Sequence, residues 1–330
     1  MVVLVGAAPA NAAISSRSRT NYTANDGVTA VSDRLRPVSF DQTSLSTPTQ
    51  IRVGVATPDL AALDAFRRDT GATVRSFTYY RAWATSPTFD AKYAAAVAAR
   101  GAVPSVTWEP WHPANGVSQP AYSLRRIAAG AHDTYLKTWA SGIRAYGRMV
   151  ELRFAHEMNG TWYPWGVGVN GNTAADYVAA WRHVHAVFRA AGVTNVRWIW
   201  SPNVSFYGST PLARVFPGSW YVHRVGLDGY NGGAVLGMGG WKSFREIFGP
   251  SLNEVRSLTS RPIMVSETGS IEVGGDKAAW ITDFLRQLAA EPGVVGFTWF
   301  NFNKEAPWLV QSSVAATRAF ATGVAAPVYR

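Results

Sequence analysis

The 330-residue sequence contains no cysteine, which excludes disulfide bonds, thiolate metal sites and cysteine nucleophiles. Charged residues are scarce, at 16% of the chain, and only five of the 31 basic residues are lysine. The net charge of +10 is dispersed and forms no basic stripe, which argues against a nucleic-acid partner. Beyond the first 13 residues no apolar run approaches the roughly 20 residues needed to cross a bilayer, so we expect no membrane span.

Aromatic residues, by contrast, are abundant. They make up 13% of the chain and include 14 tryptophans, a high number for this length. Hydrophobic residues reach 47%, which is enough for one large core or two modest ones. So many aromatic side chains predict an aromatic-rich surface or cleft as well as a core.

The first 50 residues differ in composition from the rest. Residues 2–13 are small and apolar and end in Ala10-Asn11-Ala12-Ala13, a spacing that signal peptidase accepts. We therefore expect residues 1–13 to be a signal peptide and the protein to be secreted. Because no basic residue precedes the apolar run, either the start is misplaced or the basic region before it has been cut away. An alanine-rich tail is the alternative. Residues 14–50 are rich in serine and threonine without a sustained period, which is typical of a linker or a loosely attached segment.

Between residues 51 and 330, short β-branched or aromatic runs alternate with alanine-rich amphipathic stretches. The runs that predict strands are 51–56, 73–79, 103–108, 149–156, 196–200, 223–227, 262–266 and 294–300. The stretches that predict helices are 59–70, 92–100, 132–146, 174–191, 241–248 and 277–290. This alternation without a domain boundary favours an α/β fold, a single (β/α)8 TIM barrel over 51–330. A doubly wound sheet is the alternative, disfavoured because no strand candidate leads into a glycine-rich phosphate loop.

Four acidic residues follow strand candidates in this arrangement. Glu109, Glu157 and Glu267 end the third, fourth and seventh candidates, and Asp228 follows the sixth. The carboxyl ends of barrel strands meet at one mouth, where barrel enzymes place their active sites. Carboxylates there, beside aromatic rings, are suited to cleaving a glycosidic bond, because one acid protonates the leaving oxygen while a carboxylate attacks or activates water. Arg153 has the strand parity of Glu157, so it could hold a carboxylate ionised or form an ordinary buried ion pair.

The strongest local signal is the segment from Arg153 to Trp165, where a strand runs into a His-Glu pair and three aromatic residues follow within four positions. An ordinary strand end with a salt-bridged glutamate is the alternative interpretation. The run HEMNG followed by WYPW resembles the acid/base segment of glycoside hydrolase family 26, whose members include β-mannanases, mixed-linkage β-glucanases and β-1,3-xylanases. The resemblance covers most of residues 51–330.

The resemblance implies roles for individual residues. Glu157 would be the general acid/base, and Glu267, in the run VSETG, the nucleophile. The substrate-binding residues that it implies, with Asn159 as a further candidate near the sugar 2-hydroxyl, are His156, Trp162, Asp228, Tyr230, Trp299, Trp108, Trp111 and His112. Tyr230 would donate a hydrogen bond to Glu267. Trp299 would lie beneath the sugar, and both Trp299 and Trp162 would be exposed to the cleft.

These roles imply a retaining endo-β-glycanase that acts by double displacement, in this family most often on β-1,4-mannan. Mixed-linkage β-1,3-1,4-glucan and a bacterial exopolysaccharide are alternative substrates, and a non-catalytic carbohydrate-binding barrel is the alternative from another class. No metal and no organic cofactor is implied. The partner expected is a β-linked polysaccharide, and the protein is expected to be a monomer.

Overall fold

The computed structural model describes residues 46–47, 49–235, 237 and 239–329. The expected signal peptide at 1–13 and nearly all of the expected linker at 14–50 lie outside the described residues. Within the described ranges, no helix combines the length and the apolar character needed to cross a membrane.

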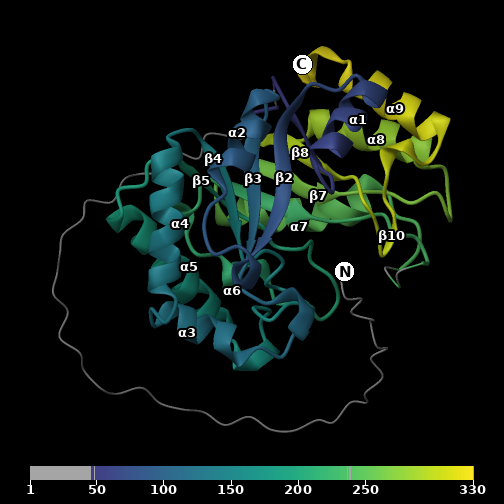
Figure 1. Cartoon of the computed structure of the whole chain (residues 1–330). Helices are drawn as coiled ribbons and strands as arrows, with labels where there is room; N and C mark the ends of the chain where they lie inside the picture. Colours follow the sequence, from purple (N-terminus) through teal and green to yellow (C-terminus); the bar gives the residue numbers. More distant parts are fainter. Residues whose placement is uncertain (1–45, 48, 236, 238, 330) are drawn as a thin grey trace, which may run out of the picture. The chain divides into compact units, whose positions relative to one another are not determined.

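Eight parallel strands form a closed barrel in sequence order. They are β1 (Arg52–Ala56), β2 (Val74–Ala82), β3 (Val103–Glu109), β4 (Val150–Phe154), β5 (Val196–Trp200), β6 (Arg224–Asp228), β7 (Ile263–Thr268) and β8 (Val294–Phe300). Each strand pairs with the next, and β8 closes the barrel against β1. The expected (β/α)8 barrel is thereby confirmed, and Figure 1 shows helices flanking its strands.

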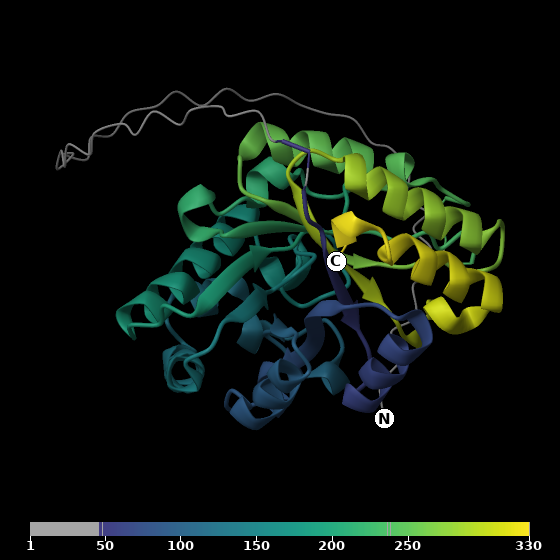
Figure 2. The ribbon, with the colours of Figure 1, turned by 90° about the horizontal axis from the view of Figure 1, so that it is seen from above.

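Helices lie around the strands, as the view from above shows (Figure 2). The α-helices are α1 (Leu60–Thr70), α2 (Ala91–Ala99), α3 (Leu124–Ala128), α4 (Asp133–Tyr146), α5 (Ala174–Ala190), α6 (Leu212–Val215), α7 (Phe244–Leu258), α8 (Lys277–Ala290) and α9 (Val314–Val324). Short 3₁₀ helices lie at Trp83–Thr85, Pro113–Asn115, Pro120–Tyr122, Val169–Gly171, Ser219–Tyr221, Val310–Ser312 and Pro327–Tyr329. A two-stranded hairpin, β9 (Asn303–Lys304) and β10 (Ala306–Pro307), follows β8.

Polar side chains fix where the long helices begin. α5 starts with a capping box formed by Thr173 and Asp176, and α7 starts with one formed by Ser243 and Glu246. In each box the two side chains satisfy backbone N–H groups that have no partner within the helix. The chain therefore passes from loop to helix at a defined residue.

Four helices differ from the sequence prediction, since the short helices α3 and α6 have no counterpart in it and two longer helices also depart from it. α7 continues to Leu258, whereas the prediction ended it at residue 248, before Pro250. Pro250 removes one backbone hydrogen bond, but Leu252 and Val255 are buried on one face and hold the helix against the core. α9 has no counterpart in the prediction and packs against α8.

A charge cluster closes the amino-terminal end of the barrel. Glu151 on β4 is buried, and its Oε1 accepts hydrogen bonds from Arg52, Arg197 and Arg224 at 3.3, 3.0 and 2.8 Å. Ser76 donates to its Oε2 at 3.0 Å. This carboxylate is therefore engaged within the barrel floor, at the end opposite the one where barrel enzymes place their reactive groups.

Candidate active site

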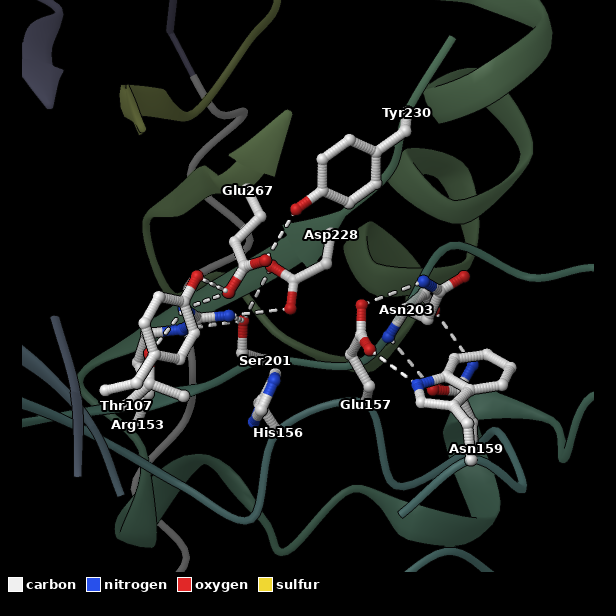
Figure 3. A network of polar contacts seen from close by, with 12 residues as sticks. Thr107, Arg153, His156, Glu157, Asn159, Ser201, Asn203, Asp228, Tyr230 and Glu267 are labelled. Carbon is white, nitrogen blue, oxygen red and sulfur yellow. Dashed lines mark hydrogen bonds and ion pairs between the residues drawn. The ribbon is translucent and has the colours of Figure 1, made fainter. Parts of the chain in front are cut away.

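Glu267 lies on β7, near the carboxyl ends of the strands, and three side chains donate hydrogen bonds to its carboxyl group. Arg153 Nη1 and the Tyr80 hydroxyl donate to Oε1 at 2.7 and 2.8 Å. The Tyr230 hydroxyl donates to Oε2 at 2.6 Å, so the expected Tyr230–Glu267 hydrogen bond is present. Figure 3 shows Arg153 and Tyr230 pointing at this carboxyl group, which is fixed in orientation before any ligand binds.

The surroundings of Glu267 favour its ionised form. Burial by itself raises the pKa of Glu267, but the charge of Arg153 and the hydrogen bonds from Tyr230 and Arg153 outweigh burial, and the pKa lies below its usual value. A carboxylate that is ionised, oriented and nearly buried is chemically suited to act as a nucleophile.

Arg153 joins Glu267 to a second carboxylate, Asp228. Arg153 Nη2 lies 2.6 Å from Asp228 Oδ2, and the Ser201 hydroxyl donates to Asp228 Oδ1 at 3.1 Å. Asp228 is completely buried and both of its oxygens are engaged, so the prediction that it contacts the substrate is wrong. Burial raises the pKa of Asp228, Arg153 opposes this rise, and the Glu267 carboxylate adds to it. Asp228 thus shares the guanidinium charge with Glu267.

Glu157 lies beyond the end of β4 and is held by a different set of donors. Asn203 Nδ2 donates to Oε1 at 3.0 Å, and Trp162 Nε1 donates to Oε2 at 2.7 Å. Ala155 and Glu157 have positive φ angles of 46° and 53°, a left-handed backbone that is strained for residues with a Cβ. This turn, rather than continued strand alternation, sets the direction of the Glu157 side chain.

The two glutamates differ in their electrostatic setting. Burial and the negative charge of Glu267 raise the pKa of Glu157 to about 7, and the hydrogen bonds from Asn203 and Trp162 counter this only in part. Near neutral pH, Glu157 can therefore hold a proton while Glu267 is ionised. Acid/base chemistry on a glycosidic bond requires carboxyl groups whose pKa values are separated in this way.

Asn159 belongs to the framework that holds Glu157. Its Oδ1 accepts a hydrogen bond from Asn203 N at 2.9 Å, and its Nδ2 donates to Asn203 O at 2.8 Å. The side chain is buried and both ends of its amide are used, and substrate binding by Asn159 stays a prediction. Asn159 fixes the loop that carries Asn203, and through it the position of the Glu157 carboxyl group.

The tryptophans divide between the site and the core. Trp162 is 38% exposed, as expected, and its ring packs over Gly160, where an added Cβ would lie 2.3 Å from the ring. Trp299 and Trp108 have no exposed surface. The predictions that Trp299 is exposed to the cleft and that Trp108 binds substrate are therefore wrong.

Both buried tryptophans point outward from the barrel, toward the helices. The ring of Trp299 contacts Trp280 of α8 and Phe320 of α9. Trp108 contacts Trp139 of α4 and Phe188 of α5. Neighbouring residues in a strand face opposite sides, and the aromatic residue of β8 on the site side is Phe300, whose ring contacts Tyr80 and Tyr230.

The other candidate residues lie on or next to the ends of β3 and β4. His156 is buried, its Nδ1 has no partner among the described residues, and burial lowers its pKa to about 3, so the ring is neutral. Trp111 Nε1 lies 3.4 Å from Glu109 Oε2, and burial raises the pKa of Glu109 to about 7. His112 Nδ1 accepts a hydrogen bond from Ala114 N at 3.3 Å. Substrate binding by His156, Trp111 and His112 stays a prediction.

Sequence reasoning misses two residues that hold the glutamates, Tyr80 and Asn203. Both stand near or after the carboxyl end of a strand, the position from which barrel side chains reach the site. A search limited to carboxylates and to one aromatic-rich motif passes over a single tyrosine and a single amide. In the part of the chain that the structure describes, no group of three or more His, Asp or Glu side chains is placed to hold a metal ion.

The fold and the site together have the arrangement that cleavage of a glycosidic bond requires, a (β/α)8 barrel with two carboxyl groups at its mouth. Two buried glutamates at the carboxyl ends of strands four and seven have opposite pKa shifts. An exposed tryptophan donates a hydrogen bond to one of them.

The sequence profile of Glycosyl hydrolase family 26 matches residues 136–281. Endoglucanase H of Acetivibrio thermocellus is 34% identical over 274 residues, which cover 82% of this chain and 29% of that protein. Mannan endo-1,4-beta-mannosidase A and B of Caldalkalibacillus mannanilyticus is 37% identical over 90 residues, covering 26% of this chain and 17% of that protein. The chain thus aligns with less than a third of the length of either relative.

Solved structures share the fold at low sequence identity. A modular endo-β-1,4-mannanase from Cellulomonas fimi has a TM-score of 0.65 at 18% identity, covering 86% of this chain and 72% of that one. A β-mannanase from Bacteroides ovatus has a TM-score of 0.63 at 17% identity, covering 85% of this chain and 90% of that one. The profile match and the long alignment show that the chain is similar to glycoside hydrolase family 26 over most of its length.

Proposed function

We propose that the chain is a retaining endo-β-glycanase in which Glu267 is the nucleophile and Glu157 the general acid/base. The observation that supports this most directly is the opposite pKa shift of the two glutamates. The pKa of Glu267 is lowered, and that of Glu157 is raised to about 7. A double displacement needs this distribution of one proton over two carboxyl groups.

In the first step Glu267 attacks the anomeric carbon and Glu157 gives its proton to the leaving glycosidic oxygen. The Glu267 carboxylate is already oriented by Arg153, Tyr80 and Tyr230, so little reorganisation is required for attack. Glu157 is oriented by its own two donors, which fix the direction of proton transfer. The products of this step are a covalent glycosyl-enzyme and a released chain end.

In the second step Glu157 removes a proton from water, which attacks the glycosyl-enzyme and frees Glu267. The negative charge of Glu267 is one of the causes that raise the pKa of Glu157. Esterification of Glu267 removes that charge, so the pKa of Glu157 falls and the group becomes available as a base. The same carboxyl group therefore serves as acid and then as base.

For the polysaccharide we propose β-1,4-mannan as the first substrate. The relatives of this chain include mannan endo-1,4-beta-mannosidases, one of which is 37% identical to the chain over 90 residues. Mixed-linkage β-glucan is the second candidate, because the long alignment, over 82% of the chain, is to a protein named Endoglucanase H. That protein is more than three times longer than the aligned part, so its name describes more than the matched segment.

We also propose that the protein acts outside the cell and as a monomer. A polysaccharide is too large to be taken up intact, and the apolar residues 2–13 are the feature that supports secretion. Mass spectrometry of culture medium and of cells, with light scattering of the purified protein, tests both points.

Variants of the two glutamates test the catalytic roles. Glu157→Ala and Glu267→Ala should each lower kcat by about a thousand-fold or more while the protein stays folded. The capping variant Glu246→Gln is the control and should keep full activity. Added azide should restore turnover in both alanine variants, with retained configuration in the glycosyl azide from Glu157→Ala and inverted configuration from Glu267→Ala. The reverse assignment of products would exchange the two roles.

The stereochemistry of the native reaction and the substrate are tested separately. Proton NMR should show the product anomer retained, and a crystal structure should show the two carboxyl groups about 5 to 5.5 Å apart, the separation of retaining enzymes. Glucomannan, galactomannan and barley-type β-glucan should be assayed individually for reducing ends. Release from β-glucan alone would replace mannan by the second candidate, whereas binding of polymer without any release would favour a non-catalytic barrel.

A further inference from the structure

Exposed aromatic residues extend from Trp162, which contacts Glu157, to the loop between β5 and α6. Phe206 and Tyr207, in the loop between β5 and α6, are 44% and 105% exposed. The ring of Phe206 lies 5.7 Å from that of Trp162, with an angle of 33° between the planes. Trp162 donates a hydrogen bond to Glu157 and contacts Phe206, and Tyr207 is the next residue of the same exposed loop. We call Trp162, Phe206 and Tyr207 the aromatic platform.

The loop that carries the platform is held in place on both sides of the two rings. Ser205 N donates to Ser251 Oγ at 2.8 Å, and Ser205 Oγ donates to Glu254 Oε2 at 3.0 Å, which ties the loop to α7. Phe206 N donates to Ser209 Oγ at 3.1 Å, and Ser209 N donates to Phe206 O at 3.0 Å. The rings are thus displayed by a built turn, and their exposure to water is not the result of a loose segment.

The same loop contributes to the acid/base. Asn203, three residues before Phe206, donates to Glu157 Oε1, and Trp162 of the platform donates to Glu157 Oε2. A general acid must lie next to the glycosidic oxygen that departs. Sugar residues attached to that oxygen therefore extend over the groups that surround Glu157, whereas the sugar that becomes covalently attached lies over Glu267.

We propose that Phe206 and Tyr207, together with Trp162, bind the sugar residues on the leaving-group side of the cleaved bond. The ligand is a β-linked pyranose chain, because a run of such rings offers successive apolar faces of C–H groups to stacked aromatic side chains. This inference rests on the proposed function and adds to it the residues that bind the departing half of the polymer. The exposed rings are desolvated only when a chain of sugars covers them.

The experiment compares two substrates in the double variant Phe206→Ala/Tyr207→Ala. One is the polymer that the wild-type enzyme hydrolyses, and the other is an aryl trisaccharide of the same linkage, whose leaving group carries no sugar. Covering about 55 Å² of aromatic surface is worth about ten-fold in affinity. We therefore expect kcat/KM on the polymer to fall about ten-fold further than kcat/KM on the aryl trisaccharide, mainly through KM.

Trp220→Ala is the matched control. Trp220 is 73% exposed but lies in the 3₁₀ helix that precedes β6, at the amino-terminal end of the strands, so its loss should not change the ratio of the two kcat/KM values. Thermal unfolding midpoints of all variants establish that each is folded. Equal losses on both substrates, or no loss on either, would overturn the platform while leaving the glycosidase intact. If wild-type enzyme hydrolyses no polysaccharide, the proposed function fails first, which separates the two outcomes.

Discussion

Replacement of Arg153 by methionine gives a direct test of the charge network in the site. Arg153 and Asp228 are buried and Glu267 nearly so, and the guanidinium contacts both carboxyl groups, at 2.6 and 2.7 Å. Breaking a buried ion pair costs about 3 to 5 kcal/mol. The variant can limit this loss by protonating one carboxyl group. Because a carboxyl group of the unfolded chain has a pKa of about 4.3 and is ionised at pH 7, this protonation costs about 3.7 kcal/mol at that pH. Both figures predict that Arg153→Met is strongly destabilised at neutral pH.

The stability loss caused by Arg153→Met should depend on pH, because the variant changes the pKa of a buried carboxyl group. In the wild-type protein the pKa of Glu267 is lowered, so its stabilising contribution is complete above the unfolded-state pKa and is lost only as the pH falls through the lowered value. In Arg153→Met the pKa of Glu267 should rise above the unfolded-state value, and acid then stabilises the variant. At pH 5 the cost of protonation falls to about 1 kcal/mol. The difference in unfolding free energy should therefore shrink by more than half between pH 7 and pH 5.

Urea unfolding of the wild-type protein and the variant at both pH values measures this difference. Arg68→Met is the control, because Arg68 is exposed and its ion pair with the neighbouring Asp69 lies at the surface, so its loss should cost less than about 0.5 kcal/mol at either pH. A loss of less than about 1 kcal/mol for Arg153→Met at pH 7, or an equal loss at pH 7 and pH 5, would refute the argument that Arg153 compensates buried negative charge.

Three further outcomes are expected. Glu151→Gln should lower the free energy of unfolding in urea by about 3 to 5 kcal/mol, because Glu151 Oε1 balances the charge of three arginines at the barrel floor. An unchanged free energy of unfolding would show that solvent already screens these arginines. Asn203→Ala removes a hydrogen bond that lowers the pKa of Glu157, so the basic limb of the kcat/KM profile should move to higher pH, and a shift to lower pH would contradict this account. Trp299→Phe should lower the unfolding temperature and leave KM for the polymer unchanged, and a large rise in KM would restore Trp299 to the site.

The barrel could be predicted from the sequence because its signals are local. Each strand candidate is a short β-branched or aromatic run, and each overlaps an observed strand, as 196–200 and 294–300 do without any difference in their bounds. The extension of α7 through Pro250 could not be predicted in this way, because local preference at Gly249-Pro250 opposes the helix. Burial of Leu252 and Val255 against the rest of the fold overrides that preference.

The difference between local signals and contacts made by the assembled fold also explains why the sequence indicates the two glutamates but not several of their neighbours. Strand alternation assigns faces in β3 as it does for Arg153 in β4, because Thr107 accepts a hydrogen bond from Arg153 inside the barrel at 2.8 Å. Its neighbour Trp108 must then face the helices. Alternation assigns a face to each side chain, but it does not identify partners that barrel closure brings together.

Tyr80 and Glu267 are 187 residues apart in the chain and 2.8 Å apart in the site. Their contact depends on the tilt and stagger of strands that no single segment specifies. The pKa values depend on the same closure, because burial, the largest cause of the rise at Glu157, is a property of the assembled barrel. The identity of a catalytic carboxyl group can therefore be encoded in a short motif, whereas its protonation state is determined by residues from across the whole chain.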